Sequence, residues 1–234
     1  MASILFVCAT APEREAASRL VPAAAVTGPA ELTRAETAAG RVDFLVGGVG
    51  VAATAAATSA ALASGVYGLV VSAGIAGGFV PVAIGTTVIA TAVVQADLGA
   101  EDGADFLPLS ALGLGQERHD LDPALVRLLL ARLGWIGDAV TGAVLTVSTV
   151  TGSAATAAAR RTRCPDAVAE AMEGAGVLAA ASRHDVAFAE VRTISNPVGP
   201  RDRAAWRIAP ALSALGSAVA AIASAPITFG KGPS

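Results

Sequence analysis

Short apolar segments alternate with helix-length segments along most of the chain. Apolar runs bounded by turn residues predict buried strands, and the alanine-rich or amphipathic stretches between them predict helices. The predicted strands are residues 3–9, 42–47, 69–73, 86–94, 139–147, 167–171 and 187–194. The predicted helices are residues 12–20, 51–63, 123–133, 153–161 and 174–183, with a last helix from about residue 203. This alternation indicates an α/β fold, a three-layer α/β/α sandwich around a mostly parallel mixed sheet.

Two long segments, residues 44–96 and 208–229, contain no charged side chain and have the length of membrane spans. The first, however, is interrupted by many glycines and by Pro81, and the second is rich in alanine and serine. A buried sheet and a packed terminal helix explain both segments better. The first residues also lack the basic segment of a signal peptide. We therefore expect a soluble protein.

Composition narrows the class of protein further. The 234 residues suit a single domain spanning 1–234, and the net charge of −3 without a basic stripe argues against nucleic acid as a partner. Cys8 and Cys164 form neither a disulfide framework nor a metal-ligand spacing, which favours a reduced, cytoplasmic protein. His119 and His184 are isolated, so we expect no metal and no cofactor.

Polar side chains gather where two predicted neighbouring strands end. Glu173 follows one strand, and Arg192, Ser195 and Asn196 lie at the end of the next. The crevice outside the carboxyl ends of strands is where open α/β sheets bind ligands. The glycine-rich segment 72–78 follows another strand and would let backbone groups approach the same ligand. These residues together predict a site for one small molecule.

The motifs in this region resemble a known superfamily. Ala-Met-Glu-Gly-Ala at 171–175, followed by Arg-Thr-Ile-Ser-Asn at 192–196, resembles the nucleoside phosphorylases and nucleosidases. The extension Ser-Asn-Pro-Val-Gly-Pro-Arg-Asp-Arg-Ala-Ala-Trp at 195–206 is similar to the futalosine hydrolase branch, enzymes of menaquinone biosynthesis that cleave hypoxanthine from futalosine. The resemblance extends through most of the chain, but only residues 172–206 are specific. It implies a nucleoside phosphorylase-like fold and N-glycosidase activity.

The resemblance also implies roles for single residues. Met172 would stack beneath the ribose, and Glu173 would hold the ribose hydroxyl groups. Glu15 would activate the hydrolytic water, with Glu13 as a rival; on a helix the two side chains point about 200° apart, so only one can face the site. Further ligand contacts are expected from Ala76, Gly77, Arg192 and Ser195, and from the wall formed by Thr149, Val150 and Thr151.

Asn196 distinguishes between purines. Hypoxanthine presents two adjacent acceptors, N7 and O6, to which an amide NH₂ group can donate. Adenine presents N7 beside an amino donor, which better suits the aspartate that adenine-specific nucleosidases carry at this position. Asn196 therefore favours a 6-oxopurine. An amide is not an acid, so the proton for the base would come from water or from Asp202.

The substrate that the resemblance implies has a carboxylated benzoyl arm at its 5′ end. Arginine pairs well with a carboxylate, so Arg201 and Arg203 are candidates for holding this arm. Trp206 or Phe106 would stack on its ring. The alternative is that both arginines cap a loop and pair with Asp202.

Three other functions stay open. They are a nucleosidase for methylthioadenosine, S-adenosylhomocysteine or aminodeoxyfutalosine, a purine nucleoside phosphorylase, and a nucleoside-binding protein without catalysis. The resemblance also implies a homo-oligomer, because relatives complete their pockets with a neighbouring subunit. The polar segment 97–116, which has no clear periodicity and predicts a long loop, is the candidate contact. The expected partner is a small-molecule nucleoside, and no interaction with a membrane is expected.

Overall fold

The structure is a computed structural model that describes residues 3–21, 24–25, 32–37, 40–103, 105–134 and 138–227. The strands are β1 (Ile4–Cys8), β2 (Ala24–Ala25), β3 (Leu32–Thr37), β4 (Gly40–Val46), β5 (Leu69–Gly78), β6 (Thr87–Gln95), β7 (Gly99–Asp102), β8 (Asp105–Pro108), β9 (Arg118–Asp120), β10 (Ala139–Thr146), β11 (Ala167–Ala171) and β12 (Ala187–Pro197). The helices are α1 (Ala11–Ser18), α2 (Val51–Ser64), α3 (Pro123–Leu133), α4 (Ala154–Arg163), α5 (Gly174–Arg183) and α6 (Ile208–Ile222), and a 3₁₀ turn, η1 (Arg203–Ala205), precedes α6.

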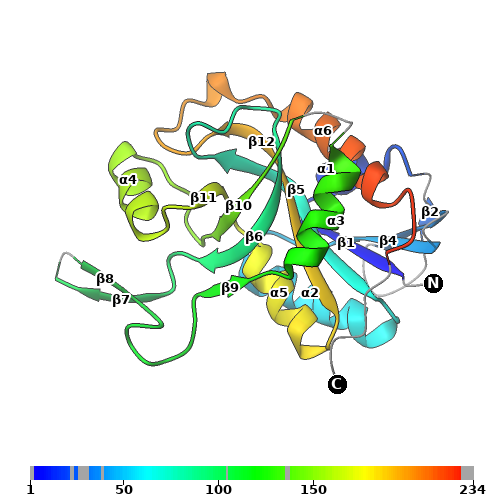
Figure 1. Cartoon of the computed structure of the whole chain (residues 1–234), viewed down its shortest axis with the longest axis horizontal. Coiled ribbons are helices and arrows are strands. Elements are labelled where there is room, and N and C mark those ends of the chain that lie inside the picture. Colours follow the sequence, from blue (N-terminus) through cyan, green and yellow to red (C-terminus); the bar gives the residue numbers. More distant parts are fainter. Residues whose placement is uncertain are drawn as a thin grey trace.

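The main sheet has the strand order β11-β10-β6-β12-β5-β1-β4-β3-β2, and β9 pairs with β6. The central pairs β12–β5, β5–β1 and β1–β4 are parallel, whereas β12–β6 and β4–β3 are antiparallel. Helices α1, α3 and α6 pack on one face and α2 and α5 on the other, and Figure 1 shows α1 and α6 side by side. The predicted three-layer sandwich around a mostly parallel mixed sheet is confirmed.

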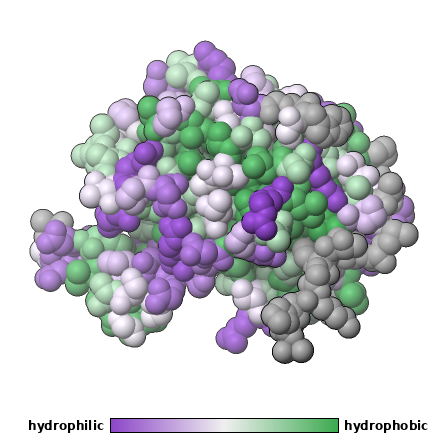
Figure 2. All heavy atoms as spheres, viewed as in Figure 1, coloured by the Kyte–Doolittle hydropathy of each residue, from purple (hydrophilic) through white to green (hydrophobic). Residues whose placement is uncertain are grey.

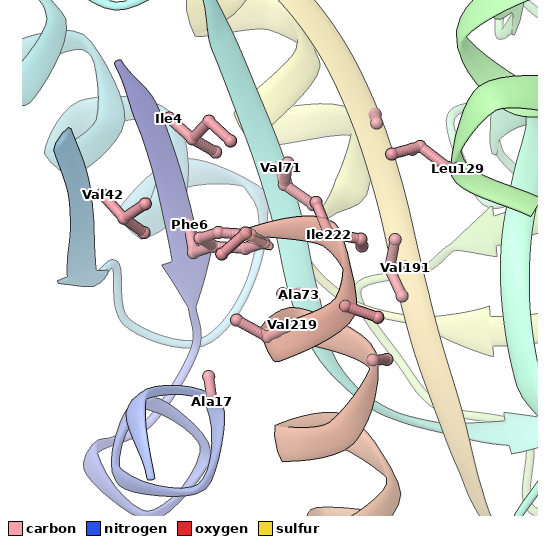
Figure 3. Close-up of a cluster of buried hydrophobic side chains, with 14 of the residues drawn as sticks. Ile4, Phe6, Ala17, Val42, Val71, Ala73, Leu129, Val191, Val219 and Ile222 are labelled. Carbon is pink, nitrogen blue, oxygen red and sulfur yellow. The ribbon is translucent and has the colours of Figure 1, made fainter. Parts of the chain in front are cut away.

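The alternation of side chains along β1 explains the layers. Ile4 and Phe6 lie in the larger apolar cluster with Val219 of α6 and Leu129 of α3 (Figure 3). Leu5 and Val7 point the other way, into the cluster formed with α2 and α5. A strand buried on both faces has to be apolar throughout, which accounts for the uncharged strands β5 and β6 within the segment 44–96. None of the described helices has the length and apolarity that a membrane crossing requires.

Several predicted elements differ from those of the structure, and three differences are the largest. The glycine-rich segment continues β5 as a strand to Gly78; a Cβ atom at Gly78 would lie 2.8 Å from the Ile194 side chain, so glycine allows the close packing of β12. The segment 97–116, expected as a loop, contains the antiparallel pair β7–β8. This hairpin projects from the molecule, and polar and apolar side chains mix on its surface (Figures 1 and 2). The last helix begins at Ile208, because η1 occupies the preceding residues.

A β-bulge interrupts the pairing of β12 with β5. Ile194 pairs with Ala76, and Asn196 pairs with the next residue, Gly77, so Ser195 is the extra residue. Side chains alternate along a strand, and one extra residue reverses the face of every residue after it. The bulge therefore turns Asn196 away from the face to which Ile194 points.

A buried polar cluster stabilises the sheet where β3 and β4 pair. Asp43 of β4 is fully buried, and it accepts two hydrogen bonds from Arg34 (2.7 and 2.8 Å) and one from the Tyr67 hydroxyl (2.6 Å). Burial alone would raise the pKa of Asp43, but the hydrogen bonds from Arg34 and Tyr67 lower it below its ordinary value.

Asp43→Asn is expected to lower the free energy of unfolding by about 3 kcal/mol at neutral pH, the low end for a buried pair because Arg34 is partly exposed. The folded-state pKa lies below the unfolded one, so this stabilisation exists above the unfolded pKa and is lost as the pH falls through the folded pKa. The difference from wild type therefore shrinks in acid. Denaturant unfolding at pH 7 and pH 3 measures it, and a difference that does not change with pH would contradict the assignment.

Candidate active site

A cleft of about 330 Å³ opens where β1, β5 and β12 end, beside the first turns of α1 and α5. It is lined by Ala9, Thr10, Pro12, Glu13, Val49, Ile75, Ala76, Gly77, Val150, Glu170, Ala171, Met172, Glu173, Ser195, Asn196, Trp206, Ile208 and Leu212. A smaller hollow of about 100 Å³ adjoins it, shares Asn196 and Trp206, and adds Thr151 and Arg201. A third hollow, of about 350 Å³ between α3 and α6, has Asp138 as its one ionisable side chain. The cleft has three carboxylates and is the candidate site.

Glu13 enters the cleft from the first turn of α1. Thr10 and Glu13 form a capping box: Glu13 Oε2 accepts from the Thr10 backbone N–H (3.0 Å) and hydroxyl (2.9 Å). Glu13 Oε1 accepts from the Ile75 backbone N–H of β5 (3.0 Å). The side chain is 6 % exposed. The cap thus holds a carboxylate at a fixed position beside β5.

Glu15, the residue expected to activate water, does not face the cleft. Its side chain is 69 % exposed and lies 3.8 Å from Arg14 on the outer side of α1. The physical reason is the helical angle between positions 13 and 15: the capping box turns Glu13 inward and so turns Glu15 to solvent. The Thr-x-x-Glu pattern at 10–13 is the sequence signal that identifies the inward residue.

Glu173 and Met172 lie in the cleft at the start of α5. Glu173 Oε1 accepts from the Gly50 N–H (3.3 Å), and Oε2 accepts from the Met172 N–H (3.2 Å). Glu173 is 7 % exposed, and Met172 is partly exposed to the cleft. A carboxylate at this position is suited to accept hydrogen bonds from a vicinal diol.

Arg192 lies beneath the cleft and does not line it. Its guanidinium is 1 % exposed and contacts Glu173 (Nη1–Oε2, 3.3 Å), Glu190 (Nε–Oε1, 2.9 Å) and the Ser72 hydroxyl (2.9 Å). Burial alone would lower the pKa of Arg192, but Glu190, Glu173 and Glu13 raise it above its ordinary value. The arginine is therefore a permanent cation that acts on the cleft through Glu173, and Glu190 is a partner that the sequence motifs did not reveal.

Ser195, the extra residue of the β12 bulge, and Asn196, which follows it, both line the cleft. The Ser195 hydroxyl donates to Asn196 Oδ1 (2.8 Å), and Asn196 Nδ2 donates to the Pro197 carbonyl (3.0 Å). Because Oδ1 accepts from Ser195 and one N–H bonds to Pro197, the second N–H of the amide is the donor that stays available. This orientation suits acceptor atoms on a ligand. The Asp202 carboxylate caps η1 by accepting from the Ala204 N–H, and its side chain lines neither hollow.

The wall near Val150 is fixed by a buried ion pair. Glu170 accepts from the Thr151 backbone N–H (2.7 Å) and hydroxyl (2.6 Å) and pairs with Arg160 (2.5 Å). Arg160 also donates to the Thr149 carbonyl (3.0 Å). Val150 lines the cleft and Thr151 the adjoining hollow, whereas the Thr149 side chain lines neither. Glu170 and Arg160 were not predicted, because no motif marks them.

The predicted residues for a substrate arm are divided between two places. The guanidinium carbons of Arg201 and Arg203 lie 5.4 and 5.7 Å from the centre of the Trp206 ring, which faces the cleft. Arg201 lines the adjoining hollow, and Arg203 lies outside it. Phe106 is on β8, packed against Arg163 in a separate hollow, and is not part of this cleft.

The model of the phosphorylase superfamily matches residues 3–225. A futalosine hydrolase of Streptomyces coelicolor is 49 % identical over 231 residues, 94 % of each chain. This chain belongs to the futalosine hydrolase family of the phosphorylase superfamily. A second member, the futalosine hydrolase of Acidothermus cellulolyticus, is 47 % identical over 191 residues, 81 % of this chain and 78 % of that protein.

Solved structures agree on the fold. A methylthioadenosine/S-adenosylhomocysteine nucleosidase from Neisseria meningitidis superposes with a TM-score of 0.83 at 20 % identity, covering 96 % of this chain and 99 % of its own. The futalosine hydrolase of Helicobacter pylori gives a TM-score of 0.80 at 16 % identity, covering 94 % and 97 %. The family resemblance and the nucleoside phosphorylase-like fold expected from the motifs are thereby confirmed, and the futalosine hydrolase family consists of N-glycosidases.

Proposed function

We propose that this protein hydrolyses the N-glycosidic bond of futalosine, releasing hypoxanthine and dehypoxanthinyl futalosine for menaquinone biosynthesis. The observation that carries the proposal is the convergence of Glu13, Glu173 and the Asn196 NH₂ group on one cleft in a chain 49 % identical to a futalosine hydrolase. Each residue matches one requirement of the reaction: a base for water, an anion beside the sugar and a donor for the leaving purine.

The sugar binds between Met172 and Glu173. The carboxylate of Glu173 accepts hydrogen bonds from the ribose hydroxyls, and its negative charge stabilises the oxocarbenium ion that develops as the bond from C1′ to N9 breaks. The Met172 side chain packs beneath the ring. These are the roles that the motif implies for both residues.

Water is activated by Glu13. The carboxylate accepts a proton from water while the water oxygen forms a bond to C1′, and the electron pair of the broken C1′–N9 bond moves into the purine. Asn196 donates the N–H that is not bonded to Pro197 to the N7 and O6 edge of the purine and stabilises the charge that accumulates there. The proton that finally neutralises the base comes from solvent water, since Asp202 is engaged in its cap.

Phosphorolysis is the less favourable alternative. It requires a cationic pocket open to phosphate, whereas the buried Arg192 is already paired with Glu173 and Glu190. An adenine nucleosidase is disfavoured by the amide at position 196.

The assay that tests the proposal follows release of hypoxanthine from futalosine without phosphate, with inosine, methylthioadenosine and aminodeoxyfutalosine alongside. Turnover that depends on phosphate, or a preference for the adenine nucleosides, would reject it.

The 5′ arm is held by Arg201 and Arg203 over Trp206 in this proposal. Among the described residues neither arginine forms an ion pair, and Asp202 caps η1 instead of pairing with them, so both guanidinium groups are available for a carboxylate. The double variant Arg201→Ala/Arg203→Ala is expected to raise KM for futalosine about 10-fold, the value of one charge-assisted hydrogen bond, with little change in kcat.

Inosine lacks the arm and is the control substrate: its kcat/KM should be the same in the double variant and in wild type. An unchanged KM for futalosine would remove both arginines from the site. Assembly into a homo-oligomer through the segment 97–116 also stays a prediction, which light scattering on the purified protein tests.

A further inference from the structure

Glu190 is a buried carboxylate that the proposed mechanism does not use. It lies on β12 opposite Ser72 of β5, is fully buried, and does not line the cleft. Its Oε1 accepts from Arg192 Nε, while its Oε2 has no hydrogen-bond partner among the described residues. Burial raises the pKa of Glu190, and Arg192 opposes this shift. Such a group is costly to bury, so it needs a role beyond packing.

The contacts of Arg192 indicate that role. Glu190 and the Ser72 hydroxyl hold the guanidinium at Nε and Nη2, both 2.9 Å from their partners. This leaves Nη1 directed at Glu173. A Cβ atom at Gly74 would lie 2.8 Å from Arg192 Nη1 and 2.6 Å from Glu13 Oε1, so the same edge of the guanidinium lies close to Glu13 as well.

Gly174 leaves the space that Glu190 occupies. A Cβ atom there would lie 2.6 Å from Glu190 Oε1 and 2.7 Å from its Cδ. Gly174 is the first residue of α5 and directly follows Glu173. Alanine at this position has to displace either the Glu190 carboxylate, which holds the arginine that contacts Glu173, or the first turn of α5, which directly follows Glu173.

We infer that Glu190 is a positioning residue for the reaction: it fixes Arg192 so that one guanidinium faces both Glu173 and Glu13, and Gly174 is its matched partner. The arginine offsets the repulsion between the two cleft carboxylates, and Glu190 returns one negative charge beneath the site of the developing cation. The inference deepens the proposed hydrolysis and rests on it.

The decisive variant is Glu190→Gln, which keeps the shape of the side chain and removes its charge. We expect kcat/KM for futalosine to fall about 10–100-fold, since small misplacements of a catalytic group cost up to about 10²-fold. The acid limb of the kcat/KM profile should also move to lower pH, because the remaining carboxylates share Arg192 with one competitor fewer. Asp43→Asn, also a buried carboxylate paired with arginine but distant from the cleft, is the matched control and should change stability without moving the pH profile.

The groups that set this pH dependence are few. Arg192 and Glu173 interact electrostatically with Glu190, and Glu13 and Cys8 interact electrostatically with Arg192. The elements β5, β6 and α6, which pack against β12, carry no titratable side chain, and α5 has only Arg183 in its last turn.

A double-mutant cycle tests the match with Gly174. Gly174→Ala should lower kcat/KM in the wild-type background but change it little in Glu190→Ala, where the clash is removed. Additive effects would overturn the match. A Glu190→Gln variant with wild-type kcat/KM and pH profile, or one whose loss of activity only parallels its loss of thermal stability, would overturn the positioning role. If wild type itself releases no base, the proposed function fails instead.

Discussion

Glu13→Gln is expected to lower kcat for release of hypoxanthine by about 10²–10⁴-fold, the usual contribution of a general base. The amide keeps the size of the side chain, its one oxygen can still accept from the Ile75 N–H, and its NH₂ group can donate to the Thr10 hydroxyl oxygen, so binding of the substrate should change little. What is lost is the ability to take a proton from water. Steady-state kinetics on futalosine without phosphate measure the effect.

Glu15→Gln is the matched control for this prediction. It makes the same chemical change two residues away, on a side chain that is 69 % exposed. Its kcat should lie within about two-fold of wild type, since surface substitutions away from a site have small effects. The reverse result, with activity lost at Glu15 and kept at Glu13, would mean that α1 presents a different face to the substrate.

Asn196→Asp is expected to lower kcat/KM for futalosine by about 10²-fold or more, because a carboxylate would face the two acceptor atoms N7 and O6 of hypoxanthine. The ratio of kcat/KM between aminodeoxyfutalosine and futalosine should rise, since the 6-amino group can donate to the new carboxylate. The two substrates differ only at the purine, so this ratio isolates contacts with the base.

Asn196→Ala separates the loss of a donor from the gain of a charge. It removes the NH₂ group without adding an acceptor, so it should weaken futalosine cleavage without favouring the 6-amino substrate. If Asn196→Asp leaves the substrate ratio unchanged, the purine does not contact this residue. Ser195→Ala gives an independent check, because losing the Ser195 hydroxyl frees the amide to rotate and should also relax the preference.

The sequence predicted the fold well because most of its elements are buried on both faces or strongly amphipathic. Hydrophobic pattern alone placed β1, α2 and α5 within two residues of their bounds. The pattern could not distinguish the glycines of β5 from a loop. Glycine is needed in that strand because Ile194 and Val198 approach it closely, and this tertiary contact is not visible in the sequence.

The motif identified residues that line the cleft, whereas it could not choose between candidates that differ only in geometry. Met172, Glu173 and Asn196 lie in the cleft as the motif implied. The capping box turns Glu13 into the cleft, and the angle between positions 13 and 15 on the helix then directs Glu15 to solvent. Glu190 has no motif, because its role depends on a contact with a neighbour on the same strand and with Gly174.

Because of the bulge in β12, recognition of the purine depends on the number of residues in this strand as well as on their identity. The face on which Asn196 appears is determined by the number of residues between it and Ile194, and the pairing with Gly77 depends on that number. Losing one residue here would carry an unchanged asparagine to the opposite side of the sheet. Within such a lineage, single-residue insertions and deletions at this point are therefore an evolutionary route to altered purine preference that an alignment of residue types alone would miss.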